Sequence, residues 1–215
     1  MKKSSFIFKY AGVACIPVYS AFTFASHLNN KQLGPMENWL SDYGNPLLNP
    51  GGAGFYNAGC ILTALMLAIF YIGMVRWYGR GRDARKTNIC FAGAQVSGLT
   101  GSVFLILTAV FPLGTNTQLH STFSTVNMIA MDFFLSFTAI GFLMNPQMNK
   151  IIGIFGFLTS VFNIVTMNAF ENFYISEWIY FLLFMAYLVL VTLHYDLIAG
   201  KKETGAIPAS QNKPA

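Results

Sequence analysis

Six apolar stretches, each long enough to cross a lipid bilayer, constrain what this chain can become. They are Ser5–His27, Gly54–Trp77, Ile89–Phe111, Ser121–Met144, Ile151–Phe170 and Glu177–Ala199. About twenty helical residues span the hydrocarbon core, and lipid offers no partners to unpaired backbone groups, so such segments fold as α-helices. Charged residues make up only 10% of the chain, against about a quarter of a soluble domain. We therefore predict an all-α, polytopic membrane protein, a single six-transmembrane-helix bundle over residues 1–200.

The basic residues predict the orientation of the bundle. Six spans place both termini on one side of the membrane, and if that side is the cytoplasm, Lys31 is the one basic residue of 13 on the other side. Cytoplasmic segments of membrane proteins are enriched in Lys and Arg in this way. We therefore expect both termini to be cytoplasmic, in a multi-pass protein of the cell membrane. The net charge of +5 then reflects topology, and we expect no nucleic-acid partner.

The two ends of the chain carry further predictions. Residues 201–215 are polar and lack the apolar residues of a core, so we expect a disordered cytoplasmic tail. The basic start followed by an apolar stretch also fits a cleavable signal peptide, with residues 21–26 as the cleavage site. Cleavage would leave five spans and place Lys201 and Lys202 opposite Lys2 and Lys3, which favours retention of the first span.

Asp132 is the most costly residue of the bundle because it lies near the middle of the fourth stretch. A carboxyl group at that depth costs a few kcal/mol on insertion scales and normally faces the bundle interior. At 100° per residue, the bundle-facing side includes His120, Ser124, Asn127 and Asp132, and the lipid-facing side includes Phe133, Phe134 and Phe137. With no Lys or Arg at comparable depth, we expect Asp132 to be protonated or hydrogen-bonded to a neutral residue. The candidates are Gln95, Ser97, Thr100 and Asn163. Asp132 then either fixes helix packing or serves a proton, an ion or a substrate.

The third stretch carries small residues at intervals of four. One row is Gly93, Ser97 and Gly101, and the neighbouring row is Ala94, Gly98 and Ser102. Small residues at this spacing let helix backbones approach closely in lipid. We predict that this helix is the central packing helix of the bundle, in preference to a dimer interface.

The segment from Leu28 to Ala53 is the one long connection on the outer side. Trp39 and Tyr43 suit the membrane interface, whereas three prolines and Gly51-Gly52 forbid a long helix. We predict a short interfacial helix over Pro35–Tyr43, followed by an irregular turn into the second span.

Polar residues that could do chemistry gather on this outer side, and three hypotheses fit them. His27, His120 and Asp42 have the side chains of metal ligands, without a metal-site spacing. Ser41, His120 and Asp42 could form a nucleophile, base and acid for acyl transfer, without a nucleophile-elbow motif. Alternatively, Ser41 and Asp42 cap or turn the outer loop, and His120 hydrogen-bonds that loop to the fourth helix. No motif indicates a cofactor.

Several short motifs lie in and beside the loops. They are Leu40-Ser41-Asp42-Tyr43-Gly44, Asn49-Pro50, Phe55-Tyr56-Asn57-Ala58-Gly59, and Phe111-Pro112 followed by His120-Ser121. They resemble the motifs of the bacterial and archaeal membrane family known as domain of unknown function 998, although Tyr43 stands where that family usually has leucine. The layout is more distantly similar to the DRAM-like six-helix superfamily. The resemblance implies a six-helix membrane protein with an outer-face cluster at Ser41, Asn57 and His120, and it suggests lipid-linked work.

These observations lead to three functional hypotheses. The first is a non-enzymatic protein that binds membrane lipid, or accompanies another membrane protein, through a polar cavity between His120 and Asp132. The ligand-binding residues would be Asn57, His120, Ser124, Asn127 and Asp132. The second is an outer-leaflet lipid-modifying hydrolase or transferase, and the third is a small proton-coupled transporter.

Overall fold

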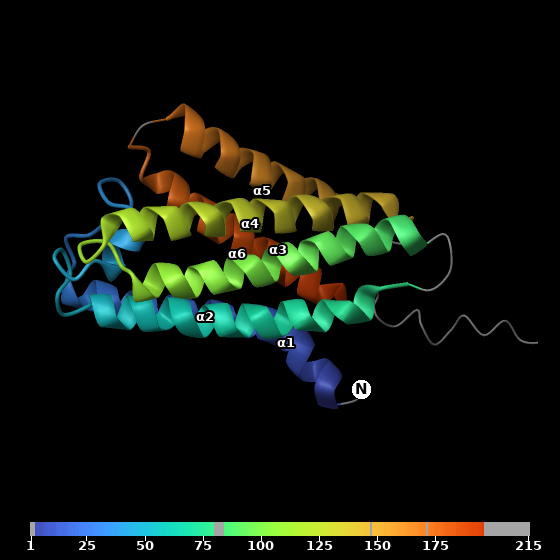
Figure 1. Cartoon of the computed structure of the whole chain (residues 1–215), viewed down its shortest axis with the longest axis horizontal. Coiled ribbons are helices and arrows are strands. Elements are labelled where there is room, and N and C mark those ends of the chain that lie inside the picture. Colours follow the sequence, from blue (N-terminus) through green and yellow to red (C-terminus); the bar gives the residue numbers. More distant parts are fainter. Residues whose placement is uncertain (1–2, 80–83, 147, 171, 196–215) are drawn as a thin grey trace, which may run out of the picture.

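The structure is a computed structural model that describes residues 3–79, 84–146, 148–170 and 172–195 (Figure 1). Its six α-helices are α1 (Lys3–Asn29), α2 (Ala53–Gly73), α3 (Arg85–Val110), α4 (Thr117–Met144), α5 (Lys150–Ala169) and α6 (Ile175–Leu193). Two short 3-10 helices, η1 (Leu40–Gly44) and η2 (Met74–Trp77), complete the helices of the described residues, which contain no strand. The expected tail at 201–215 lies outside the described residues.

All six α-helices are long and apolar enough to cross a membrane. The shortest has 19 residues and the longest has 28. At about 1.5 Å per residue these helices are roughly 28 to 42 Å long, against a hydrocarbon core of about 30 Å. The predicted six-helix, all-α architecture of a multi-pass membrane protein is therefore confirmed.

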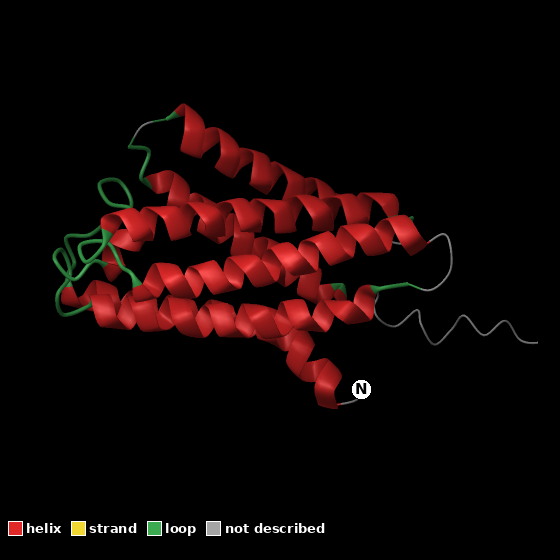
Figure 2. Ribbon diagram, in the orientation of Figure 1, coloured by secondary structure: helices red, strands yellow, loops and turns green. Residues whose placement is uncertain are grey.

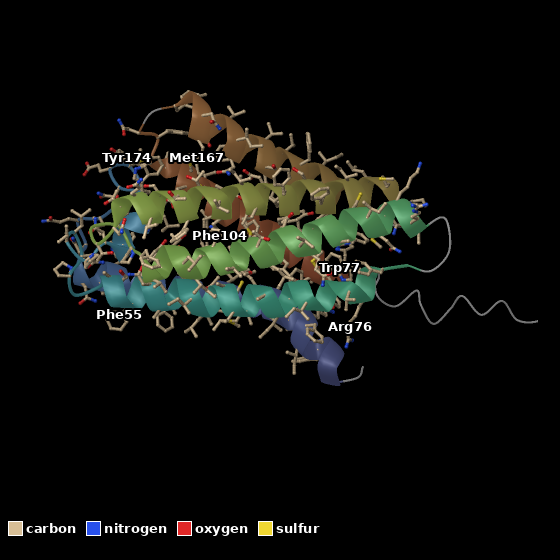
Figure 3. All side chains as sticks on the ribbon, viewed as in Figure 1. Phe55, Arg76, Trp77, Phe104, Met167 and Tyr174 are labelled. Carbon is tan, nitrogen blue, oxygen red and sulfur yellow. The ribbon has the colours of Figure 1, made fainter. Side chains whose placement is uncertain are left out.

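Helices that follow one another in sequence pack side by side, and α6 returns to contact α1 (Figure 1). The connections after α1, α3 and α5 gather at one end of the bundle, which we call the loop end (Figure 2). Arg76 and Trp77 lie at the opposite end, which we call the basic end, far from Phe55 and Tyr174 (Figure 3). Because α1 begins and α6 ends at the basic end, both termini of the bundle lie on one side. Which side of the membrane this is stays a prediction.

The small residues of α3 receive large side chains from the helices on both sides. A Cβ atom on Gly93 would lie 3.0 Å from the ring of Phe137 on α4, and one on Gly98 would lie 2.6 Å from the ring of Tyr71 on α2. Gly101 faces the end of Met131 on α4 in the same way. The prediction that these small residues pack within the chain is therefore confirmed, but α3 is not the central helix, because its main contacts with other α-helices are with α2 and α4.

Helix α4 begins at Thr117, four residues before the predicted start of its span at Ser121. The earlier start has a local cause, since the side chain of Asn116 accepts a hydrogen bond from the Leu119 N–H at 3.1 Å. A side chain that caps a free N–H in this way stabilises the first turn. His120 therefore lies inside the first turn of α4, and Asp132 remains near the middle of the helix.

The buried side of α4 is wider than the sequence predicts. Asp132 is buried, as expected, and Phe133 is exposed. Phe134, however, was expected to face lipid and is fully buried, with its ring centroid 4.9 Å from that of Tyr71 and 6.1 Å from that of Phe184. The prediction for Phe134 was wrong because α4 contacts α3 and α5 along its length and also meets aromatic residues of α2 and α6.

The segment between α1 and α2, residues 30–52, forms a cover over the loop end that we call the roof. The predicted interfacial helix over Pro35–Tyr43 is replaced by the five-residue η1. Carboxylates cap the N–H groups at its start: that of Trp39, the residue before η1, donates to Asp42 Oδ2 at 3.0 Å, and that of Leu40 donates to Glu177 Oε2 at 2.7 Å. The roof is therefore shaped by side-chain partners, one of which comes from α6.

Candidate functional site

Tyr43 is the central residue of the roof and is only 2% exposed. Its hydroxyl donates to the Leu33 carbonyl at 2.8 Å and accepts from His27 Nδ1 at 2.8 Å. Since the hydroxyl hydrogen points to a carbonyl, His27 must carry a proton on Nδ1. Burial raises the pKa of Tyr43, so the neutral phenol keeps its hydrogen for this bond. These contacts fix the roof to the end of α1.

Two asparagines connect the roof to the helices beneath it. Asn49 is fully buried, and its Nδ2 donates to Ser26 Oγ at 2.9 Å and to the Tyr43 carbonyl at 3.2 Å. Asn57, at the start of α2, donates from Nδ2 to the Gly44 carbonyl at 3.0 Å. A Cβ atom on Gly44 would collide with Asn57 Oδ1, so this contact requires glycine. Asn57, expected as a ligand-binding residue, therefore has a structural partner in the roof.

Two neighbouring residues of α6 tie the roof to the far side of the bundle. Glu177 Oε2 accepts from the backbone N–H of Leu40 at 2.7 Å and of Ser41 at 3.4 Å. Trp178 Nε1 donates to the Asn38 carbonyl at 3.2 Å. Because α1, α2 and α6 all hold the roof, it forms a fixed surface above the helices.

His120 binds the end of α3 instead of the roof. Its Nδ1 lies 3.1 Å from the Phe111 carbonyl oxygen and 3.2 Å from the Thr108 carbonyl oxygen, so Nδ1 is the protonated, donating nitrogen. The expectation that His120 tethers the outer loop to α4 was therefore wrong. The physical reason is the early start of α4, which puts the imidazole beside the last turn of α3.

Asp42 shapes η1 and interacts with His120 only through space. Burial raises the pKa of Asp42, while the hydrogen bond from the Trp39 N–H and the electrostatic interaction with His120 act in the opposite direction. Among the described residues, no hydrogen bond joins the side chains of Ser41, Asp42 and His120. That part of the chain also contains no group of three or more His, Cys, Asp or Glu residues that could hold a metal ion. The acyl-transfer and metal hypotheses thus stay predictions from residue type.

Asp132 lies in a polar cluster between α4, α5 and α6. Asn163 Nδ2 donates to Asp132 Oδ2 at 2.8 Å, and the Tyr180 hydroxyl donates to Asp132 Oδ1 at 3.3 Å. Ser160 Oγ adds a bond to the Asp132 backbone carbonyl at 3.4 Å. Both partners of the carboxyl group are neutral, and Asn163 is one of the residues named from the sequence. The expectation of a neutral hydrogen-bond partner is therefore confirmed.

An open cleft of about 550 Å³ lies between α1 and α6, beneath the roof. Its outer rim carries His27, Lys31 and Pro35, and its walls are mainly apolar. Phe24 and Leu182 are 60% and 66% exposed, so the side of the cleft that opens between the helices faces the bilayer. The cleft therefore leads from the apolar outer surface of the helices to the polar groups of the roof.

A second, smaller cavity of about 110 Å³ lies inside the bundle. Its polar lining consists of Tyr19, Tyr56, Thr63, Asn127, Glu177 and Tyr180. Asn127 is the one expected ligand-binding residue in this lining, and Asp132 is reached through Tyr180. Neither His120 nor Ser124 lines it, so the cavity extends from Glu177 toward Asp132, not from His120.

A protein-family model matches residues 13–194, and its description is "Protein of unknown function (DUF998)". The chain belongs to this family. The match covers all six spans, at least in part, and the family carries no assigned activity. Searches of curated proteins and of solved structures gave no match. The more distant similarity to the DRAM-like superfamily stays a prediction.

In this DUF998 protein, the motifs that carry the resemblance build the loop end. Tyr43, Gly44, Asn49 and Asn57 form the hydrogen bonds that hold the roof. Phe111 supplies a carbonyl to His120 at the turn between α3 and α4. These motif residues thus have structural roles in this chain, and Leu40, Tyr43 and Tyr56 of the motifs also line the cleft or the cavity.

The sequence did not single out Thr63 or Tyr180 of this DUF998 protein, and it placed Glu177 among the polar residues of the outer side without assigning it a role. Glu177 and Leu40 are 137 positions apart, so no spacing pattern connects them. Glu177 opens the sixth predicted stretch at its outer boundary, so the depth argument that identified Asp132 does not apply to it. Thr63 and Tyr180 are common residue types in apolar helices and carry no signal of a site.

Proposed function

We propose that this protein is a non-enzymatic lipid-binding protein that holds an anionic membrane lipid at the loop end. One acyl chain lies in the cleft between α1 and α6, and the headgroup lies at Lys31 and His27. The observation that carries this proposal is the cleft itself, because it combines an apolar, bilayer-facing wall with a cationic rim.

The size and lining of the cleft support a lipid chain. Its volume of about 550 Å³ falls within the roughly 300–1,000 Å³ of small-molecule sites. Phe24, Phe181 and Leu182 provide apolar surface along the helices. An acyl chain in the cleft would exchange contact with bulk lipid for contact with these walls. The chain therefore orients the bound lipid and adds little to its affinity.

The rim supports an anionic headgroup. Lys31 is exposed and is the one basic residue between the first two spans. An ammonium group beside an anionic lipid surface contributes about 1 kcal/mol, which is about fivefold in affinity. His27 adds a ring whose Nδ1 is already held by Tyr43, so the ring is fixed beside the rim.

The proposal is tested by native mass spectrometry of the delipidated protein in mild detergent, titrated with phosphatidylglycerol and with phosphatidylcholine. We expect tighter binding of phosphatidylglycerol, and we expect Ser20→Phe, which fills the cleft, to weaken binding of both lipids. Ser121→Phe is the matched control, since Ser121 is also exposed but lies outside the cleft. Equal lipid binding by Ser20→Phe and the wild type would refute the proposal.

The charge at the rim is tested separately. Lys31→Gln should weaken the binding of phosphatidylglycerol about fivefold and leave the binding of phosphatidylcholine unchanged. Lys86→Gln is the control, because Lys86 is an exposed lysine at the basic end. A lipid preference that survives Lys31→Gln would place the headgroup elsewhere.

A further inference from the structure

The cavity inside the bundle is a separate space from the cleft. The two share only a wall of Tyr19, Leu40 and Phe181, in which the rings of Tyr19 and Phe181 have centroids 4.3 Å apart. The apolar lining of the cavity includes Met128, Met131 and Met185. Its polar lining, given above, comes from α1, α2, α4 and α6.

Two polar atoms of this lining have no hydrogen-bond partner within the protein. Thr63 is 1% exposed and its hydroxyl is unpaired, and Asn127 Oδ1 is buried and also unpaired. A buried polar group without a hydrogen-bond partner destabilises the fold. Both residues line the cavity, so a polar occupant would supply the missing partners.

Thr63 departs from the usual behaviour of threonine in this bundle. The hydroxyls of Thr108, Thr138, Thr159 and Thr166 each donate to the carbonyl four residues earlier in their own helix. A threonine in an apolar helix normally satisfies its hydroxyl in this way. The buried hydroxyl of Thr63 makes no such bond, and Thr63 lines the cavity.

The cavity also joins the two carboxyl groups of the bundle. Glu177 lines it at the loop end, beneath η1, and Tyr180 lies one helical turn further along α6. The Tyr180 hydroxyl donates to Asp132 Oδ1 at 3.3 Å, so Tyr180 connects the cavity wall to the Asp132 cluster. Polar groups therefore continue from the loop end to the middle of α4.

We propose that the cavity is a water-binding site that carries a hydrated path from Glu177 to the Tyr180–Asp132 pair. The wall of the cavity is mainly apolar, and its polar groups are the water partners. A cavity needs at least roughly 10–15 Å³ open to a water-sized probe to hold one water, a water occupies about 30 Å³ in the liquid, and each bound water needs two to four polar partners. The volume of about 110 Å³ accommodates several waters. The hydroxyls, Asn127 Oδ1 and Glu177 supply the partners. The inference is independent of the lipid proposal, since it concerns the other side of the Tyr19–Phe181 wall.

Radiolytic hydroxyl-radical footprinting of the full-length protein in nanodiscs tests the inference, because radicals formed at bound water oxidise the nearest side chains. We expect Met131 and Met185, each 6% exposed, to be modified severalfold faster than Met74, which is fully buried outside the cavity. The difference in modification rate between these two methionines and Met74 should persist when a bulk radical scavenger is added. Modification of Met131 and Met185 as slow as that of Met74 would overturn the inference.

The variant Thr63→Val tests whether the labelling depends on the unpaired Thr63 hydroxyl. Thr63→Val should lower the modification rate of Met131 severalfold, because it removes one of the atoms that binds water. Thr138→Val is the matched control: Thr138 is fully buried, donates to the Phe134 carbonyl and does not line the cavity, so labelling should be unchanged. Continued protection of Met74 in both variants reports that they are folded. Equal labelling of Met131 in the wild type and Thr63→Val would count against the proposal.

Discussion

The bond between Asn163 and Asp132 provides a direct test of what holds α4 and α5 together. Asn163 is 2% exposed and Asp132 is 8% exposed, and their side chains meet at 2.8 Å. Asn163→Leu keeps the approximate volume but leaves Asp132 Oδ2 without its donor. Asp132→Leu leaves the Asn163 amide and the Tyr180 hydroxyl without this acceptor. Each single change therefore leaves a buried polar group without its hydrogen-bond partner. The double change removes both polar groups of the Asn163–Asp132 pair.

Two magnitudes compete in this prediction. A hydrogen bond to a charged group contributes about 1.5–3 kcal/mol in soluble proteins. Interhelical polar contacts in membranes average about 0.6 kcal/mol and reach about 1.7 kcal/mol, because the separated helices find other partners in the membrane. The short distance and deep burial place this pair near the upper membrane value. We expect each single variant to lower the free energy of unfolding by about 2 kcal/mol, with a coupling energy of about 1–1.5 kcal/mol.

Reversible unfolding with sodium dodecyl sulfate in mixed micelles, followed by circular dichroism, measures these energies in a double-mutant cycle. Asn168→Leu is the control on the same helix, because Asn168 is exposed and its Nδ2 donates to the Ile164 carbonyl of α5 itself. That control should change the free energy of unfolding by less than about 0.5 kcal/mol. If the two single changes add to within about 0.5 kcal/mol in the double variant, the contact does not couple the helices and the reasoning fails.

Two further predictions concern packing and pH. Gly98→Ala should lower the free energy of unfolding by about 1–3 kcal/mol, because its Cβ would lie 2.6 Å from the buried ring of Tyr71. In the same assay, Gly54→Ala, with nothing within 4 Å, should have little effect, and equal stability of the two variants would contradict this. For Asp42, burial raises the pKa in the folded protein, so the folded state keeps its proton to higher pH than the unfolded chain. Stability should therefore fall, relative to Asp42→Asn, as pH rises from about 3.8. The melting temperatures of the wild type and of Asp42→Asn, measured upward from about pH 3.8, give this difference in stability. Parallel profiles of melting temperature against pH would contradict the prediction.

The sequence predicted the features that depend on one helix at a time. Long apolar stretches require six spans, and the small residues Gly93 and Gly98 require close neighbours whichever helices supply them. Asp132 is predictable in the same way, because a carboxyl group at that depth must face the bundle. Its partner Asn163 was one of four candidates, since depth in the membrane narrows the choice but does not determine which helices are adjacent.

The sequence could not predict the features that depend on helix neighbours. The cleft exists because α6 returns to α1, and the cavity exists because Thr63, Asn127 and Tyr180 come from three helices that meet at one height. His120 shows the limit within a single segment. Its partner was expected in the roof, but an asparagine cap lengthened α4 by one turn and placed the imidazole against α3. One hydrogen bond outside the apolar pattern therefore changed the role assigned to a candidate catalytic residue.

The first two turns of α6 explain why the cleft and the cavity lie next to each other. Glu177 binds the N–H groups of η1, and Tyr180, one turn later, faces the cavity and Asp132. Phe181 lines both spaces, and Leu182 lies on the cleft side, exposed to lipid. Because these residues share one helix, a movement of α6 that widened the cleft would also pull Glu177 from the roof and Tyr180 from Asp132. We therefore expect lipid binding in the cleft to change the access of water to the cavity through α6, and a change in Met131 footprinting on addition of phosphatidylglycerol would reveal that effect.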